Sequence, residues 1–219
     1  MTGVQRTIAA CLGIVAVVIG LFVYSVMRTP TLSDAQLKEM GVFILPTPRE
    51  ISEFALTSHR GEPFTLEDLE GRWTFAFFGF TNCPDICPTS MSVLGQAQTR
   101  LSESDAGRAG EFQGLMVTVD PERDTLDRLS EYVGAFSSDL IGVRGDLDTT
   151  AGFAKELHVA FAKVPVLGPD AVAIADAYQV DHTANVVIIN PHGHYHGFIK
   201  YPQQPDNIAA TFETLAANF

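Results

Sequence analysis

Residues 73–80 form a nearly continuous run of aromatic and apolar side chains, which is the most constraining feature of this sequence. A strand with one solvent-exposed face alternates apolar and polar residues, whereas a strand buried on both faces has a continuous run of apolar residues. We therefore expect residues 73–80 to form the central strand of a covered sheet. Residues 89–101, which follow a short loop, have the apolar spacing of a helix. The order here is strand, loop, helix.

The rest of the chain continues this alternation of strands and helices. The pattern predicts strands at 112–119 and 140–143, helices at 125–136 and 149–158, a hairpin at 185–201 and a closing helix at 205–218, with an earlier hairpin at 54–66 and a short helix at 33–40. Such an order indicates an α/β protein, a three-layer α/β/α sandwich with a mixed central sheet. A βαβ unit followed by ββα is the thioredoxin-like order.

The N-terminal region is different, since residues 7–27 carry no charged side chain. About 20 helical residues span the ~30 Å hydrocarbon core of a bilayer. The exit from this run has no small-residue cleavage site, so a retained transmembrane helix is favoured over a cleaved signal peptide. Arg6 favours a cytoplasmic head, which places the soluble domain in the periplasm of a bacterial inner membrane. We expect an anchor at 1–28, a proline-containing tether at 29–51 and one domain at 52–219.

The charge balance excludes one class of partner. Acidic residues outnumber basic ones, and the formal net charge is -12. A protein that binds the phosphate backbone needs the opposite sign, so no nucleic-acid partner is expected. A partner protein with a basic patch would suit this surface better.

Cys83 and Cys87 lie between the expected central strand and the expected helix. A helix N-terminus favours a nearby thiolate, so these thiols should be reactive. The pair could close a disulfide if the α-carbons lie within about 7 Å. Two thiolates also suit Cu(I), and one added imidazole makes a three-coordinate copper site. A structural disulfide, a redox pair and a metal site all remain open from these two residues alone.

The histidine that best completes such a site is His182, which precedes the apolar strand expected at 186–189. In a thioredoxin-like layout the loop entering that strand lies across from the cysteine loop. His192, His194 and His196 alternate and would share a face of an extended segment. A turn expected at Pro191 to Gly193 breaks that row, so an accessory metal site there is disfavoured.

Residues 120–124 are mostly charged and follow the strand expected at 112–119. Their simplest interpretation is a turn and a helix start, with Asp124 or Thr125 as the N-cap. Asp85, between the cysteines, is interpreted as a solvated side chain.

Three blocks of the sequence together resemble the signature motifs of the Sco/SenC family: Phe80-Thr-Asn-Cys-Pro-Asp-Ile-Cys-Pro88, Val119-Asp-Pro-Glu-Arg-Asp-Thr125 and Val180-Asp-His-Thr183. The resemblance implies a membrane-tethered, thioredoxin-like protein that delivers copper, as Cu(I) or Cu(II), to the binuclear copper site of cytochrome c oxidase. It implies Cys83, Cys87 and His182 as the copper ligands. The implied partners are the copper-site subunit of the oxidase and a periplasmic copper donor or thiol reductase.

The alternative function is enzymatic. In a thiol-disulfide oxidoreductase that keeps recipient cysteines reduced, or in a peroxiredoxin-like enzyme, Cys83 would attack and Cys87 would resolve. The fold supports both functions, so the choice between metallochaperone and enzyme rests on the site.

Overall fold

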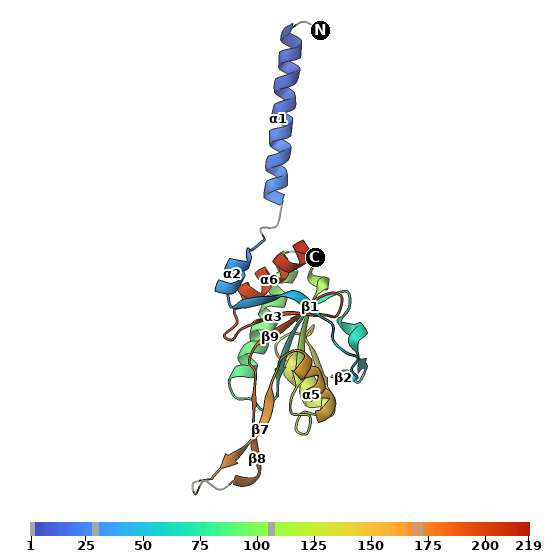
Figure 1. Cartoon of the computed structure of the whole chain (residues 1–219), viewed down its shortest axis with the longest axis vertical. Helices are drawn as coiled ribbons and strands as arrows, with labels where there is room; N and C mark the ends of the chain where they lie inside the picture. The colour runs from blue at the N-terminus through green and yellow to red at the C-terminus, as the bar shows by residue number, and fades with distance from the viewer. Residues whose placement is uncertain (1–2, 28–30, 105–107, 169, 171–172) are drawn as a thin grey trace.

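The computed structural model describes residues 3–27, 31–104, 108–168, 170 and 173–219 (Figure 1). The helices are α1 (Gly3–Met27), α2 (Asp34–Glu39), α3 (Ile86–Ser104), α4 (Leu126–Gly134), α5 (Leu147–Glu156) and α6 (Pro205–Asn218). The strands are β1 (Val42–Arg49), β2 (Leu56–Ser58), β3 (Pro63–Phe64), β4 (Trp73–Gly79), β5 (Phe112–Thr118), β6 (Ile141–Arg144), β7 (Phe161–Leu167), β8 (Ala173–His182), β9 (Val186–Ile189) and β10 (Tyr195–Ile199). Short 3-10 turns lie at Leu66–Leu69 and Ala109–Glu111.

The main sheet has eight strands in the order β1-β10-β9-β4-β5-β6-β2-β3. Strands β4, β5 and β6 run parallel, whereas β9 is antiparallel to β4, so the sheet is mixed. Every residue of β4 and β5 is buried, which confirms the predicted central strand. The units β4-α3-β5 and β9-β10-α6 give the thioredoxin-like order that the sequence predicts.

The register of β4 and β5 positions the functional part of the molecule. Gly79 at the end of β4 lies opposite Thr118 at the end of β5. The loops that leave these strands therefore start side by side at one edge of the sheet. One is the β4–α3 loop, residues 80–85, which contains Cys83 and leads to Cys87; we call it the cysteine loop. The other is the β5–α4 loop, residues 119–125.

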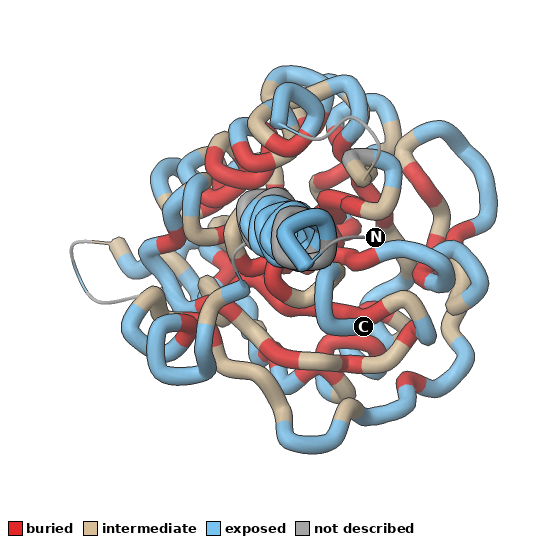
Figure 2. Tube along the Cα trace, turned by 90° about the horizontal axis from the view of Figure 1, so that it is seen from above, coloured by how far each residue is buried: buried red, intermediate tan, exposed pale blue. Residues whose placement is uncertain are grey.

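The core lies between the main sheet and its helices. Helix α3 packs against α6 and against β4 and β5, while α4 packs on β6. Figure 2 shows the buried residues gathered inside, with exposed residues around the outside. The buried aromatic rings of β4, Phe75, Phe77 and Phe78, lie at the centre of this core.

Strand β1 differs from the prediction, because it lies within the segment expected to be a tether. It pairs antiparallel with β10, and Val42 is fully buried opposite Ile199. Pro46 and Pro48 favoured a tether in the sequence, but an edge strand tolerates prolines because one side needs no ladder hydrogen bonds. The folded part of the chain therefore begins before residue 52.

Strands β7 and β8 were also not predicted. They form an antiparallel two-stranded sheet of their own, which projects from the body in Figure 1 at the end away from α1. We call this pair of strands the arm. Its register ends with Phe161 opposite His182, so His182 is the last residue of β8 rather than part of a loop.

Helix α1 covers most of the predicted anchor (Figure 1). Judged on length and hydropathy together, none of the helices among the described residues qualifies as a bilayer-spanning one. Residues 28–30, where the predicted anchor meets the predicted tether, lie outside the described residues. The membrane anchor stays a prediction.

Candidate metal centre

The cysteine loop connects β4 to α3 and presents both sulfurs at the start of the helix. Helix α3 begins at Ile86, so Cys87 lies in its first turn, where backbone N–H groups have no helical acceptor. The Cys87 N–H points at the Cys83 sulfur, with 3.4 Å between nitrogen and Sγ. The helix start therefore favours a thiolate at Cys83, as the sequence predicts.

Gly79 makes room for the buried cysteine. A β-carbon at this position would lie 2.9 Å from the Cys87 sulfur and 2.6 Å from a ring carbon of Phe77. Cys87 is fully buried, so its sulfur cannot move aside without disturbing the core. A glycine at the end of β4 is thus a packing requirement of the site.

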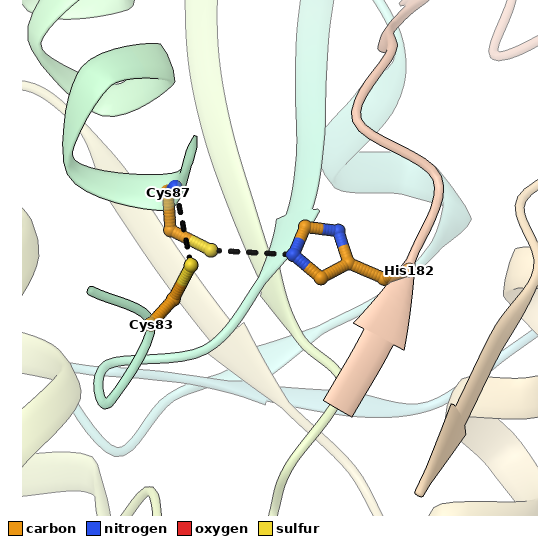
Figure 3. Close-up of side chains that lie close together, drawn as sticks. All are labelled: Cys83, Cys87 and His182. Atoms are coloured by element: carbon orange, nitrogen blue, oxygen red, sulfur yellow. Dashed lines mark hydrogen bonds between the residues drawn. The ribbon is translucent and has the colours of Figure 1, made fainter. Parts of the chain in front are cut away.

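His182 faces the two sulfurs from the opposite side (Figure 3). Its Nε2 atom lies 3.4 Å from the Cys87 sulfur, and its Nδ1 atom lies 3.2 Å from the Thr183 carbonyl oxygen. A carbonyl only accepts hydrogen bonds, so Nδ1 carries the proton and donates it there. Nε2 consequently presents a lone pair toward the sulfurs, which is the form that binds a metal.

Two aromatic rings hold the imidazole in place. The His182 ring meets Phe77 edge-on with 5.7 Å between centroids, and Phe80 with 5.8 Å. Both phenylalanines are buried and belong to β4 and its end. The ring is therefore packed against the same strand that leads into the cysteine loop.

The Sγ atoms of Cys83 and Cys87 and a ring nitrogen of His182 all lie within 4.8 Å of one another. Within the described ranges, no other group of three His, Cys, Asp or Glu side chains could meet at one metal ion. The structure thus brings together the three residues that the sequence singled out. Cys11 is exposed on α1 and has no part in this cluster.

The two thiols share one proton unequally. Hydrogen bonding between the sulfurs lowers the pKa of Cys83 to about 3, while partial burial opposes this shift. The same sulfur–sulfur hydrogen bond and burial raise the pKa of Cys87. The reduced pair therefore holds an accessible thiolate at Cys83 beside a buried thiol at Cys87.

Of the two residues predicted as the N-cap of α4, Thr125 is confirmed, and Asp124 has another role. The N-cap of α4 is Thr125, whose hydroxyl accepts from the Arg128 N–H at 3.3 Å. Asp124 is fully buried and accepts hydrogen bonds from the Thr81 N–H at 3.0 Å and from the Thr81 and Thr118 hydroxyls, each at 2.6 Å. It therefore fastens the start of the cysteine loop to β5.

Asp124 and Thr125 are equally plausible caps from the sequence, because Asp and Thr are both common at N-caps. One signal pointed elsewhere. Asp120 and Asp124 lie in the loop after a mostly apolar strand, and the carboxyl ends of neighbouring parallel strands lie at the same edge of a sheet.

The three alternating histidines have separate surroundings. His196 lies on β10 and meets the Trp73 ring edge-on at 4.9 Å, where burial lowers its pKa. His192 lies in the turn before β10, with its ring 4.9 Å from that of Phe219. The rings of His192 and His194 are 6.0 Å apart. The turn breaks the row, as the sequence indicates.

Known proteins with similar sequences include one bacterial and one mitochondrial relative. A Stutzerimonas stutzeri protein is 31% identical over 185 residues, which cover 84% of this chain and 86% of that protein. The mitochondrial SCO1 homolog of Mus musculus is 32% identical over 158 residues, 72% of this chain but 53% of that protein. The chain thus spans about half the length of this mitochondrial relative.

The fold is shared with solved structures. The structure of Arabidopsis thaliana ScoI with copper bound has a TM-score of 0.67 at 28% identity and covers 77% of this chain and 98% of that chain. The family model described as SCO1/SenC matches residues 45–217, a range that includes both cysteines and His182. Sequence, fold and the arrangement of the three side chains all lead to one assignment: the chain belongs to the SCO1/SenC family.

Proposed function

We propose that this chain is a copper metallochaperone that binds one copper ion through Cys83, Cys87 and His182 and passes it to the binuclear copper site of cytochrome c oxidase. The observation that carries the proposal is the convergence of two sulfurs and one imidazole nitrogen within 4.8 Å of one another. The similar Arabidopsis protein has copper bound in its structure, which supports copper as the cargo. The recipient is inferred from family membership.

The donor set fits copper better than the other common metals. Thiolate and imidazole are the soft and intermediate ligands that copper prefers, and a set of three leaves no strict demand on geometry. Structural zinc sites take four protein ligands, and the described residues offer three. The Nδ1 hydrogen bond to Thr183 fixes the tautomer that such a site needs.

The unequal burial of the ligands suits transfer. Cys83 and His182 are partly exposed, whereas Cys87 is fully buried. An incoming thiolate from a recipient could therefore displace the exposed ligands first, and Cys87 would be the last to release the ion. The acidic net charge of -12 favours a recipient with a basic patch around its copper site.

The same proposal includes the location of the protein. The uncharged run of residues 7–27, preceded by Arg6, supports a single-pass anchor in a bacterial inner membrane with the folded domain in the periplasm. A periplasmic copper donor or thiol reductase would then load the site. Fusions of a periplasm-dependent and a cytoplasm-dependent reporter to the C-terminus test this, since only the periplasmic reporter should be active.

One observation favours a second function, thiol-disulfide reduction. The pKa of Cys83 is lowered to about 3, so it is a thiolate at neutral pH. It could attack a recipient disulfide, form a mixed disulfide and release one recipient thiolate. Attack by Cys87 on the Cys83 sulfur would then close the Cys83–Cys87 disulfide and release the second recipient sulfur, with the Cys87 proton passing to a released thiolate. Two electrons would move from this pair to the recipient.

Copper titration of the reduced full chain separates these functions. We expect one Cu(II) per chain with intense thiolate-to-copper absorption, and weaker retention in His182→Ala. Reduction of a peptide disulfide by the metal-free chain, lost in Cys83→Ser and unchanged in His182→Ala, would instead favour the reductase. Absence of thiolate-to-copper absorption in the wild-type chain would contradict the metallochaperone function.

A further inference from the structure

The position of His182 needs an explanation, because the arm that carries it is outside the main sheet. Among the described strands, β8 pairs with β7 alone. At the base of the arm, the Thr183 N–H donates to the Ala160 carbonyl at 2.9 Å, which ties the arm to itself. Besides the short link of residues 183–185 to β9, the distance from the imidazole to the sulfurs therefore depends on contacts between the arm and the body.

Tyr178, four residues before His182 on β8, makes such a contact. Its hydroxyl donates a hydrogen bond to Asp120 Oδ1 at 2.7 Å. Asp120 belongs to the β5–α4 loop and is fully buried, so its carboxylate is a fixed point of the body. A buried carboxylate that gains a short hydrogen bond holds its donor more firmly than a solvent-exposed one would.

Arg123 adds two further contacts to the same strand. Its Nη1 donates to the Tyr178 backbone carbonyl at 3.1 Å, and its guanidinium lies 4.0 Å from the centre of the Tyr178 ring. Its Nε forms an ion pair with Asp120 Oδ2. Asp120, Arg123 and Tyr178 thus contact one another, and we call these three residues the clamp. Beside the clamp, Glu122 of the same loop forms an ion pair with Lys163 of β7 at 2.6 Å.

The loop that bears the clamp also holds the other half of the site. Asp124 fastens Thr81 at the start of the cysteine loop, as described above. The Arg123 guanidinium also lies 5.7 Å from the centre of the Phe80 ring, which packs on the His182 imidazole. One loop of seven residues, 119–125, therefore contacts both the segment that carries the cysteines and the strand that carries the histidine.

We propose that Arg123 and Tyr178 are positioning residues for His182: with Asp120 they clamp the arm to the body and set the distance between the imidazole and the two sulfurs. This inference rests on the proposed function, because it assigns the clamp to copper binding. Neither residue is a ligand. Their contribution is to hold the third ligand in place before the metal arrives, so that binding does not have to order the arm.

The smallest informative change is Tyr178→Phe, which removes the hydroxyl and keeps the ring beneath Arg123. Supporting residues behind metal ligands change metal affinity by about 10- to 100-fold when they are lost. We expect Tyr178→Phe to weaken Cu(II) binding by about 10-fold, the lower end of that range, because Arg123 still holds the strand. Arg123→Lys, which keeps the charge but loses the planar stacking, should weaken it similarly.

The decisive comparison uses the reduced full chain in detergent, with Cu(II) affinity measured by competition against a chelator of known affinity. Tyr178→Phe is measured alone and in the His182→Ala background. If the clamp acts through His182, the loss appears in the first case and vanishes in the second. The matched control is Tyr195→Phe on β10. Tyr195 is paired with Ile189, which lies opposite Thr74 at the far end of β4 from the cysteine loop.

An equal loss in both backgrounds, or no loss in either, would overturn the clamp. A His182→Ala variant that binds Cu(II) as tightly as the wild type would overturn the proposed function and the clamp together. Wild-type affinity in Tyr178→Phe, with clear weakening in His182→Ala, would overturn only the clamp. Urea unfolding of each metal-free variant shows whether it is folded. If Tyr178→Phe does not fold, Arg123→Lys is measured in both backgrounds with the same expected results.

Discussion

The two halves of the proposed copper site are built on very different supports. Cys83 and Cys87 follow β4, which is paired on both sides within an eight-stranded sheet and buried along its whole length. His182 ends a two-stranded arm that projects from the body. The cysteines therefore form the fixed part of the site. We call the imidazole the adjustable part, because its position depends on contacts between the arm and the body. Such an arrangement would suit the proposed function, in which copper is first held and then released.

Removal of a cysteine, from the fixed part of the site, should cause the largest loss of copper binding. In Cys87→Ser a hydroxyl, a harder and weaker donor for copper, replaces the buried sulfur. We expect no copper to remain on the chain after gel filtration, measured as metal per chain. Cys11→Ser, which changes the exposed cysteine on α1, is the matched control and should keep one copper. Retention of copper by Cys87→Ser would mean that the buried cysteine is not the anchor of the site.

Removal of the imidazole, the adjustable part, should weaken copper binding less, and the size of this effect should depend on the oxidation state of the copper. His182→Ala leaves two thiolates, which still suit Cu(I), whereas Cu(II) favours a nitrogen ligand. We expect Cu(II) affinity to fall by about 100-fold or more, since even outer partners of metal ligands contribute about 10- to 100-fold. Cu(I) affinity should fall less. Equal losses for the two ions, measured by chelator competition, would count against this division of roles.

The support beneath the cysteine loop can be tested through stability. Asp124→Asn replaces one carboxylate oxygen with an amide donor that faces other donors in a buried site. We expect the free energy of unfolding in urea to fall by about 2 kcal/mol. The control Asp127→Asn changes an exposed residue in the first turn of α4 and should cost about 0.5 kcal/mol or less. Similar small losses in both variants would show that Asp124 does not fasten the loop.

The pH dependence of Cys83 provides the mildest test. Its pKa is lowered to about 3, so the thiolate persists as pH falls and is lost only near that value. In the reduced Cys11→Ser chain, we expect the rate of iodoacetamide alkylation to stay nearly constant between pH 8 and pH 5. An unperturbed thiol, with a pKa of about 8.5, would lose about tenfold in rate for each pH unit in that range. A decline of that size at Cys83 would contradict the thiolate assignment.

The segment that carries the cysteines was easier to predict from the sequence than the arm that carries His182. A continuous apolar run such as residues 73–80 has few alternatives to a central strand, and β4 and α3 follow from it. The arm has no comparable signal. Most of β7 is exposed, so its residues lack the alternation by which a half-buried strand is recognised. Strand β1 was not predicted because it contains Pro46 and Pro48, and prolines are rare in strands. The edge position of β1 allows them.

The three side chains of the candidate site were predictable from the sequence, but the residues that support them were not. The three sulfur and nitrogen donors occur in recognisable motifs, and the order of elements brings the motifs together. Asp124 and the clamp depend on contacts between residues far apart in the chain, such as Tyr178 with Asp120. No spacing rule encodes these contacts, because they arise from the register of β4 and β5 and from where the arm leaves the body.

Copper binding by Cys83, Cys87 and His182 is tested most directly by X-ray absorption at the copper edge of the copper-loaded, reduced full chain, compared with the His182→Ala variant. We expect two sulfur ligands and one imidazole nitrogen in the wild type, and loss of the nitrogen contribution in the variant with both sulfurs retained. Identical copper environments in the two proteins would contradict a site made by Cys83, Cys87 and His182.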